Sequence, residues 1–132
     1  MKRKDWLFVL LVIIAGATAL TGAAQAMAPA FFLKLLSSES TITSQHFFAI
    51  VGMFMVLFGG ATLHALLSIK HHPVVILWSA FQKLGASVAV GLGVQRGVFS
   101  SLAIIVSIAD LLSGLLALWY LRRIKHEDDQ VR

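Results

Sequence analysis

The sequence predicts an all-α membrane protein, a four-transmembrane-helix antiparallel bundle with both termini on the cytoplasmic side. The chain has 132 residues, of which 58% are hydrophobic and 13% are charged, whereas soluble domains carry about 25% charged residues. Four apolar stretches, each near the roughly 20 residues that cross a bilayer core, make up most of the length. We therefore expect residues 1–132 to form a single transmembrane domain.

The predicted spans are separated by charged and turn-forming residues. Pro29 follows the first span, and Pro73 opens the third at its first turn, where proline is tolerated. The expected bounds are about residues 6–26, 46–68, 74–94 and 98–121, followed by a charged cytoplasmic tail over residues 122–132. The apolar part of the longest connection, residues 30–36, is expected to form a short helix along the membrane surface.

Lysine and arginine residues favour one orientation, because they are enriched in short cytoplasmic loops. With the N-terminus inside, the cytoplasmic flanks hold Lys2, Arg3, Lys4, Lys70, Arg122, Arg123, Lys125 and Arg132. The outer flanks hold Lys34 and Arg96. All three tryptophans then lie near the inner surface, where aromatic belts form. We expect a multi-pass protein of a bacterial cytoplasmic (inner) membrane.

The first span has an alternative interpretation as a cleaved signal peptide. Residues 1–5 are basic, residues 6–20 are apolar, and Ala24-Gln25-Ala26 fits a small-x-small cleavage site. The segment is also long enough to cross a bilayer. We expect it to be retained as a transmembrane helix.

Small residues mark the expected helix contacts, because they let backbones approach closely in lipid. They are Ala15, Ala19, Gly22, Ala23 and Ala26 in the first span, Gly52, Gly59 and Gly60 in the second, Gly85, Ala89 and Gly93 in the third, and Ala103, Ser107, Ser113, Gly114 and Ala117 in the fourth. We interpret them as packing seams. A cavity for a lipid-like ligand lined by the same residues is the alternative.

Two charged residues lie near the middle of predicted spans, Lys83 in the third and Asp110 in the fourth. At about 1.5 Å per residue, each lies roughly 15–18 Å along its helix, near the membrane midplane. They are equally far along the sequence from the turn between their spans. We expect them to pair, because an isolated charge at that depth costs about 2.5–3.5 kcal/mol on insertion scales. A proton on Asp110 is the alternative way to remove its charge.

This intramembrane polar pair has a structural and a functional interpretation. As an ion pair it sets the register and rotation of the last two helices. As a functional centre it responds to a proton or a ligand, since ionisable residues inside membranes often mark relays and substrate sites. Gln82 and Ser107 are polar neighbours in the sequence, and we expect them to add hydrogen bonds to the pair.

The five histidines do not suggest a metal or haem site. His64 has no histidine at equal depth in another span, so it is only a secondary polar candidate. The absence of cysteines excludes disulfides and thiolate-bound metals. No nucleophile motif or P-loop occurs. We therefore predict no catalytic residue, no metal site and no cofactor. Because topology explains the basic charge, the lipid bilayer is expected as the partner, and not nucleic acid.

Two stretches, residues 78–86 (WSAFQKLGA) and 108–114 (IADLLSG), resemble small four-helix bacterial inner-membrane proteins grouped as DoxX-like. The likeness covers the second to fourth spans. The Glu-x-x-Gly-Gly stretch associated with DoxX itself is not present. The resemblance implies the fold and a small partner or subunit of a membrane system. It implies no redox activity and transfers no catalytic residue.

Three functions fit these observations. The favoured one is a non-catalytic accessory or interaction subunit, bound to a larger membrane complex or to a second copy of the chain. The first alternative is a small-molecule or proton-coupled transporter that uses Lys83 and Asp110. The second is a membrane enzyme acting on a lipid or quinone, with His64 as a further polar group. A direct contact between Lys83 and Asp110 in a dry core favours a subunit, whereas separation of the two across a wet cavity favours a transport or binding site. An enzyme is expected to have a pocket that gathers several polar side chains near one membrane face.

Overall fold

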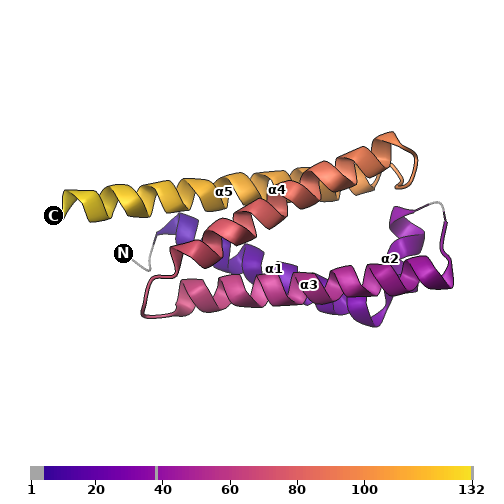
Figure 1. The fold of residues 1–132 in the computed structure, drawn as a ribbon, viewed down its shortest axis with the longest axis horizontal. Helices are drawn as coiled ribbons and strands as arrows, with labels where there is room; N and C mark the ends of the chain where they lie inside the picture. The colour runs from indigo at the N-terminus through magenta and orange to yellow at the C-terminus, as the bar shows by residue number, and fades with distance from the viewer. Residues whose placement is uncertain (1–4, 38, 132) are drawn as a thin grey trace.

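The computed structural model describes residues 5–37 and 39–131 of the chain (Figure 1). Four helices are long, namely α1 (Trp6–Met27), α3 (Ile42–Leu67), α4 (Pro73–Gln95) and α5 (Ala103–Gln130). A short helix, α2 (Pro29–Leu36), lies between α1 and α3 in the sequence. Lys2, Arg3, Lys4 and Arg132, which contribute to the predicted orientation, lie outside the described residues.

Each long helix contains an apolar window long enough to cross a membrane, with a mean hydropathy between 1.5 and 2.3. Only 17% to 33% of the residues in each window are buried inside the protein. The other side chains are at least partly exposed, and an apolar surface of this extent needs lipid rather than water around it. The four helices are therefore those of a multi-pass membrane protein.

The helix α3 begins earlier than the predicted residue 46, because a capping box starts it at Ile42. The backbone N–H of Ser44 donates to Thr41 Oγ1 at 3.1 Å. In return, the backbone N–H of Thr41 donates to Ser44 Oγ at 2.8 Å. This exchange satisfies two backbone donors at the start of the helix.

The helix α5 differs from its predicted span at both ends. It begins at Ala103 instead of residue 98, because Gly97 has a positive φ of 72° and the turn extends to residue 102. It continues to Gln130, through the residues predicted as a tail. No proline or glycine occurs after Gly114 to interrupt it. The charged segment is therefore an extension of the last helix.

The helices α1 and α3 pack with their backbones in direct contact. A Cβ atom on Gly22 would lie 2.6 Å from the carbonyl oxygen of Gly52, and one on Gly59 would lie 2.7 Å from the backbone nitrogen of Ala19. Only glycine permits this approach. Gly60, predicted at the same seam, is exposed, and a Cβ atom there would meet no other group within 4 Å, because this residue lies about 100° further round the helix.

The helices α4 and α5 pack through residues that differ in part from the predicted stripe. Gly93 is buried, but Gly85 and Ala89 are exposed. On α5, Gly114 is buried as predicted, and a Cβ atom there would lie 2.8 Å from Leu84 Cδ2. The stripe at spacing four drifts round α4, and its buried member, Gly93, packs against Phe99 of the α4–α5 turn and not against α5.

An apolar cluster joins the α1–α3 pair to the α4–α5 pair at one end of the molecule. It contains Leu7, Phe8, Leu11, Ala65, Leu66, Ile76, Ala80, Ala117 and Tyr120. At the same end, Arg123 Nη1 lies 2.7 Å from Asp5 Oδ2. The rings of Trp6 and Trp119 meet edge to face, with centroids 5.6 Å apart. These contacts close one end of the space between the helix pairs.

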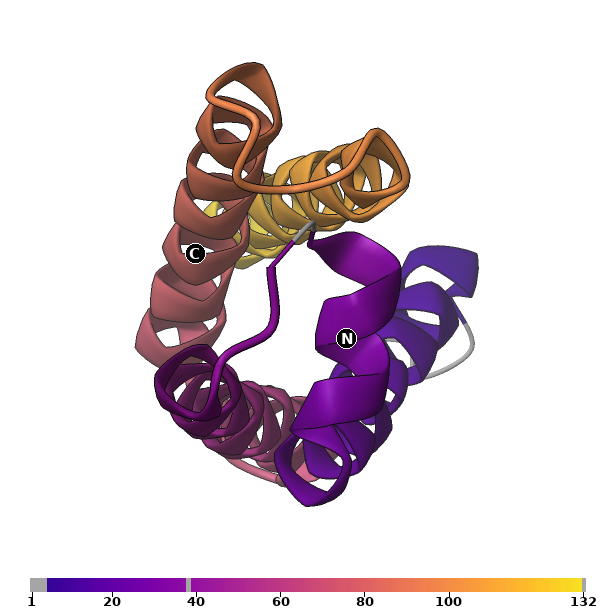
Figure 2. The ribbon, with the colours of Figure 1, turned by 90° about the vertical axis from the view of Figure 1, so that its right-hand side faces the viewer.

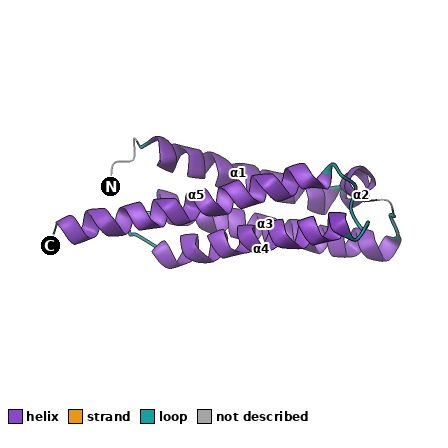
Figure 3. Cartoon of the chain, turned by 90° about the horizontal axis from the view of Figure 1, so that it is seen from above, coloured by secondary structure: helices purple, strands orange, loops and turns teal. Residues whose placement is uncertain are grey.

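At the opposite end, α2 and the α4–α5 turn connect the two pairs (Figures 1 and 3). The backbone N–H of Ser100 donates to the Leu36 carbonyl oxygen at 2.8 Å. The Ser37 hydroxyl donates to the Val98 carbonyl oxygen at 3.0 Å. Viewed from this end, the helices form a ring that α2 and its following segment partly cover (Figure 2). The predicted short helix is therefore present, and hydrogen bonds connect its end to the α4–α5 turn.

Replacing Gly59 by valine is expected to lower the free energy of unfolding by at least about 2 kcal/mol, because the side chain would collide with the α1 backbone. Gly60→Val is the matched control in the same helix, and a change within about 0.5 kcal/mol is expected for this exposed position. Thermal unfolding of the purified protein in detergent, followed by circular dichroism, measures both. Equal destabilisation by the two variants would contradict the backbone contact.

Candidate functional site

The charged pair lies between α4 and α5. Lys83 Nζ donates to Asp110 Oδ1 at 2.7 Å, a distance typical of a charge-assisted hydrogen bond. The two side chains are 16% and 17% exposed. They can meet because Lys83 and Asp110 are equally far along the chain from the turn that joins the two helices. The pair therefore neutralises both charges within one helix pair.

The two predicted neighbours do not hydrogen-bond to this pair. The Ser107 hydroxyl donates to the Ser87 carbonyl oxygen at 2.7 Å, and the two serine hydroxyls lie 3.2 Å apart. Ser107 is almost one turn from Asp110, so it meets α4 at the level of Ser87 and not of Lys83. The Gln82 side chain makes no hydrogen bond with the described residues. The prediction that both residues would support the pair was wrong.

His64 lies apart from the charged pair. It is exposed near the end of α3, and it lines neither cavity described below. Within residues 5–37 and 39–131, no three His, Cys, Asp or Glu side chains are grouped closely enough to hold a metal ion. The site is therefore built on Lys83 and Asp110 without His64.

A cavity of about 590 Å³ lies between the two helix pairs, within the ring of helices seen in Figure 2. The side chains around it come from all five helices and the α4–α5 turn, and most are apolar. They are Ile14, Ala17, Thr18, Thr21, Gln25, Phe32, Leu35, Leu36, Phe48, Val51, Met55, Gln82, Lys83, Ala86, Val90, Phe99, Leu102, Ala103, Ile105, Val106, Ala109, Asp110 and Ser113. Lys83 and Asp110 are the charged residues among them. The pair thus lies in the wall of a large apolar cavity.

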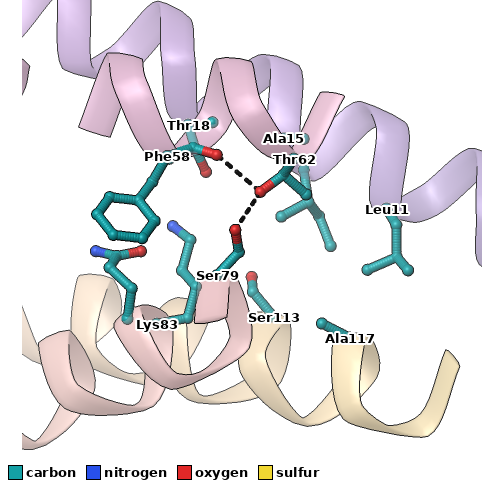
Figure 4. Close-up of a pocket in the computed structure, with 12 residues that line it drawn as sticks. Leu11, Ala15, Thr18, Phe58, Thr62, Ser79, Lys83, Ser113 and Ala117 are labelled. Atoms are coloured by element: carbon teal, nitrogen blue, oxygen red, sulfur yellow. Dashed lines mark hydrogen bonds between the residues drawn. The ribbon is translucent and has the colours of Figure 1, made fainter. Parts of the chain in front are cut away.

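The cavity adjoins a second, smaller pocket of about 30 Å³ (Figure 4). The residues that line both spaces form the floor of the cavity, and all but one are polar: Ile14, Thr18, Gln82, Lys83 and Ser113. That volume is room for about one or two water molecules. In Figure 4, Lys83 extends from α4 toward the α1–α3 pair. The polar side chains therefore gather where the open cavity meets the closed apolar cluster.

Beyond this floor, a hydrogen-bonded group crosses from α3 to α4. The Thr62 hydroxyl bonds to the Phe58 carbonyl oxygen at 2.7 Å and to the Ser79 hydroxyl (Figure 4). These groups satisfy one another, because each buried hydroxyl has a partner. They join α3 to α4 without occupying the cavity.

Three polar residues of α1 that line the cavity, Thr18, Thr21 and Gln25, were not predicted as site residues. Gln25 is 6% exposed, and its Nε2 donates to the Phe48 carbonyl oxygen at 2.9 Å. The side chains of Thr18 and Thr21 make no hydrogen bond with the described residues. Their spacing of three and four positions puts all three on one face of the helix. This stripe of polar residues in an apolar span was the available signal.

Comparisons with known proteins provide no relative. No family model, no curated protein and no solved structure matches this chain.

The variants Asp110→Asn and Lys83→Met are each expected to lower the free energy of unfolding by about 2–3 kcal/mol, because each leaves one charge unpaired in an apolar environment. The double variant is expected to recover most of that loss, since no isolated charge remains. Unfolding in detergent, followed by circular dichroism, measures this double-mutant cycle. Single variants as stable as the parent would contradict a stabilising pair. Lys34→Met and Glu39→Gln, at exposed positions outside the cavity, are the controls.

Proposed function

We propose that this membrane protein binds a mainly apolar small molecule in the cavity between its helix pairs, with the polar part of that molecule at Lys83 and Asp110. The observation that carries the proposal is the cavity of about 590 Å³ with a charged pair in its wall. Ligand sites are mostly apolar, contain a few convergent polar groups, and measure about 300–1,000 Å³. At roughly 30 Å³ for each water-sized group, this cavity holds about 20 of them.

Ligand binding is a more specific form of the accessory function expected from the sequence. A purely structural subunit would be expected to pack a closed core around Lys83 and Asp110. The cavity beside the pair instead favours a subunit that holds or presents a ligand within the membrane. Thr18, Thr21 and Gln82 support this proposal, because they have unused hydrogen-bonding groups facing the cavity.

Transport is the second candidate, because intramembrane charges that face a cavity are typical of substrate pathways. A transporter must open its site alternately to the two sides of the membrane. In this structure the apolar cluster around Leu7, Leu66 and Tyr120 closes one end. Transport therefore requires the two helix pairs to separate at that cluster, a step that binding alone does not need.

We further infer an antiparallel bundle in a bacterial cytoplasmic membrane, with both termini on the cytoplasmic side. The contact between Asp5 and Arg123 supports placing the start of α1 and the end of α5 on the same side. The distribution of lysine and arginine supports the cytoplasm as that side. The bacterial assignment rests on the DoxX-like resemblance.

Single-cysteine variants test this orientation, because the chain contains no cysteine of its own. Ser40→Cys, in the connection between α2 and α3, is expected to react with a membrane-impermeant maleimide in intact cells. Val131→Cys, beyond the end of α5, is expected to react only after the cells are permeabilised. Labelling of Val131→Cys but not of Ser40→Cys in intact cells would indicate the opposite orientation. Labelling of both would contradict the proposed four-span arrangement.

Photolabelling with trifluoromethylphenyldiazirine, an apolar probe without a charged group, tests occupancy of the cavity. The purified protein in detergent is expected to be labelled at Met55 and Val90, which line the cavity, in addition to outward-facing residues such as Val88. Peptide mapping by mass spectrometry separates these positions. Absence of label at Met55 and Val90 would overturn the proposed function.

A matched pair of variants on α4 distinguishes the cavity from the outer surface. Ala86→Trp places an indole in the cavity and is expected to remove most of the label from Met55 while leaving Val88 labelled. Ala89→Trp adds the same group at an exposed position that does not line the cavity, and it is expected to leave the label at Met55 unchanged. Equal labelling of Met55 in both variants would contradict the cavity as the site.

A further inference from the structure

The charges around the cavity sum to zero. Among the side chains that line it, Lys83 carries the positive charge and Asp110 the negative one, and the two are in direct contact. The other ion pair within the described part of the chain, between Arg123 and Asp5, lies at the closed end of the bundle and does not line the cavity. A ligand in the cavity therefore meets a charged pair that is already neutralised.

This neutral balance excludes most charged ligands on energetic grounds. An ionised head group would bring one uncompensated charge into an apolar space beside the pair, and such a charge is expensive away from water. An anion could take one of the remaining Lys83 donors only beside the Asp110 carboxylate, whose like charge would repel it. A neutral polar group avoids both penalties.

The pair and its surroundings can still form hydrogen bonds of both kinds. Lys83 Nζ has three donors and uses one on Asp110 Oδ1. Asp110 Oδ2 has no hydrogen bond with the described residues, so it can accept one. The amide of Gln82, which lines the same floor, can donate and accept. A hydroxyl group matches this site because it also donates and accepts, whereas a carbonyl oxygen only accepts.

The apolar part of the ligand has a defined place. The charged groups, Lys83 and Asp110, lie near the floor, and the cavity extends from there toward α2, with Phe32, Leu35 and Leu36 along its lining. A hydrocarbon chain directed toward α2 would contact mainly apolar side chains, with Thr21 and Gln25 of α1 along one wall. The cavity therefore fits a molecule with one polar end.

We propose that the ligand is a neutral lipid alcohol, with its hydroxyl group between Lys83 and Asp110 and its hydrocarbon part toward α2; this inference rests on the proposed function. The hydroxyl accepts a hydrogen bond from Lys83 Nζ and donates one to Asp110 Oδ2. The site rejects amphiphiles with a fixed charge because its own charges are already paired.

Competition by three amphiphiles with the same alkyl chain tests this inference on the parent protein. Dodecanol, dodecanesulfonate and dodecyltrimethylammonium, each added at the same small mole fraction of the detergent, compete with the diazirine label at Met55 and Val90. Dodecanol is expected to compete at about tenfold or more lower concentration than either ion, given the energy of an unpaired charge in the membrane. Equal competition by all three would overturn the inference and leave the proposed function intact. No label in the cavity would overturn both.

Charge-altering variants are expected to change this preference in opposite directions. Asp110→Asn leaves Lys83 unpaired, so dodecanesulfonate becomes the strongest competitor. Lys83→Met leaves Asp110 unpaired, so dodecyltrimethylammonium becomes the strongest. The double variant is neutral again and returns to a preference for dodecanol, and Lys34→Met, outside the cavity, keeps the parental order. The same order of competitors in both single variants would overturn the inference. If a single variant fails to fold, the order of competitors in the parent and in the double variant still tests the inference.

Discussion

The apolar cluster at the end where α1 begins joins two helix pairs that are otherwise almost independent. Within each pair the helices are in close contact, through glycine backbones between α1 and α3 and through the Gly114–Leu84 contact between α4 and α5. Between the pairs, Leu7, Leu66 and Tyr120 interlock at one end. At the other end the connection is made by hydrogen bonds of α2 to the α4–α5 turn. Because the pairs are joined mainly at their ends, the space between them remains open.

The charged pair lies at the boundary between the closed and the open part of this arrangement. Lys83 and Asp110 belong to the same helix pair and neutralise each other there, so the α1–α3 pair does not have to supply a counter-charge. It contributes polar but uncharged groups, including Thr18 and Gln25, to the opposite wall. Because both charges belong to the α4–α5 pair and the α1–α3 pair adds only uncharged polar groups, the apolar cavity has a floor that is neutral and can form hydrogen bonds.

The pairing of Lys83 and Asp110 could be predicted from their positions along the two helices. Residues equally far from a tight turn between neighbouring helices lie at the same level, and the two side chains are 2.7 Å apart. Rotation round a helix does not follow from position along the sequence: Ser107 lies close to Asp110 in the chain but bonds to Ser87. Gly60 and Gly85 are exposed for the same reason, although each is a small residue in an apolar span.

The sequence was sufficient for the number of long apolar helices, their approximate bounds and the presence of two midspan charges, because these features depend on composition and order along the chain. The rotation of each helix and the distance between the two pairs required the folded structure. A helix in lipid can present an apolar side chain to the bilayer or to a neighbour at little difference in hydrophobic energy, so hydropathy does not reveal which face packs. For that reason the cavity, and the fact that the stripe of Thr18, Thr21 and Gln25 faces it, depend on the assembly of all five helices.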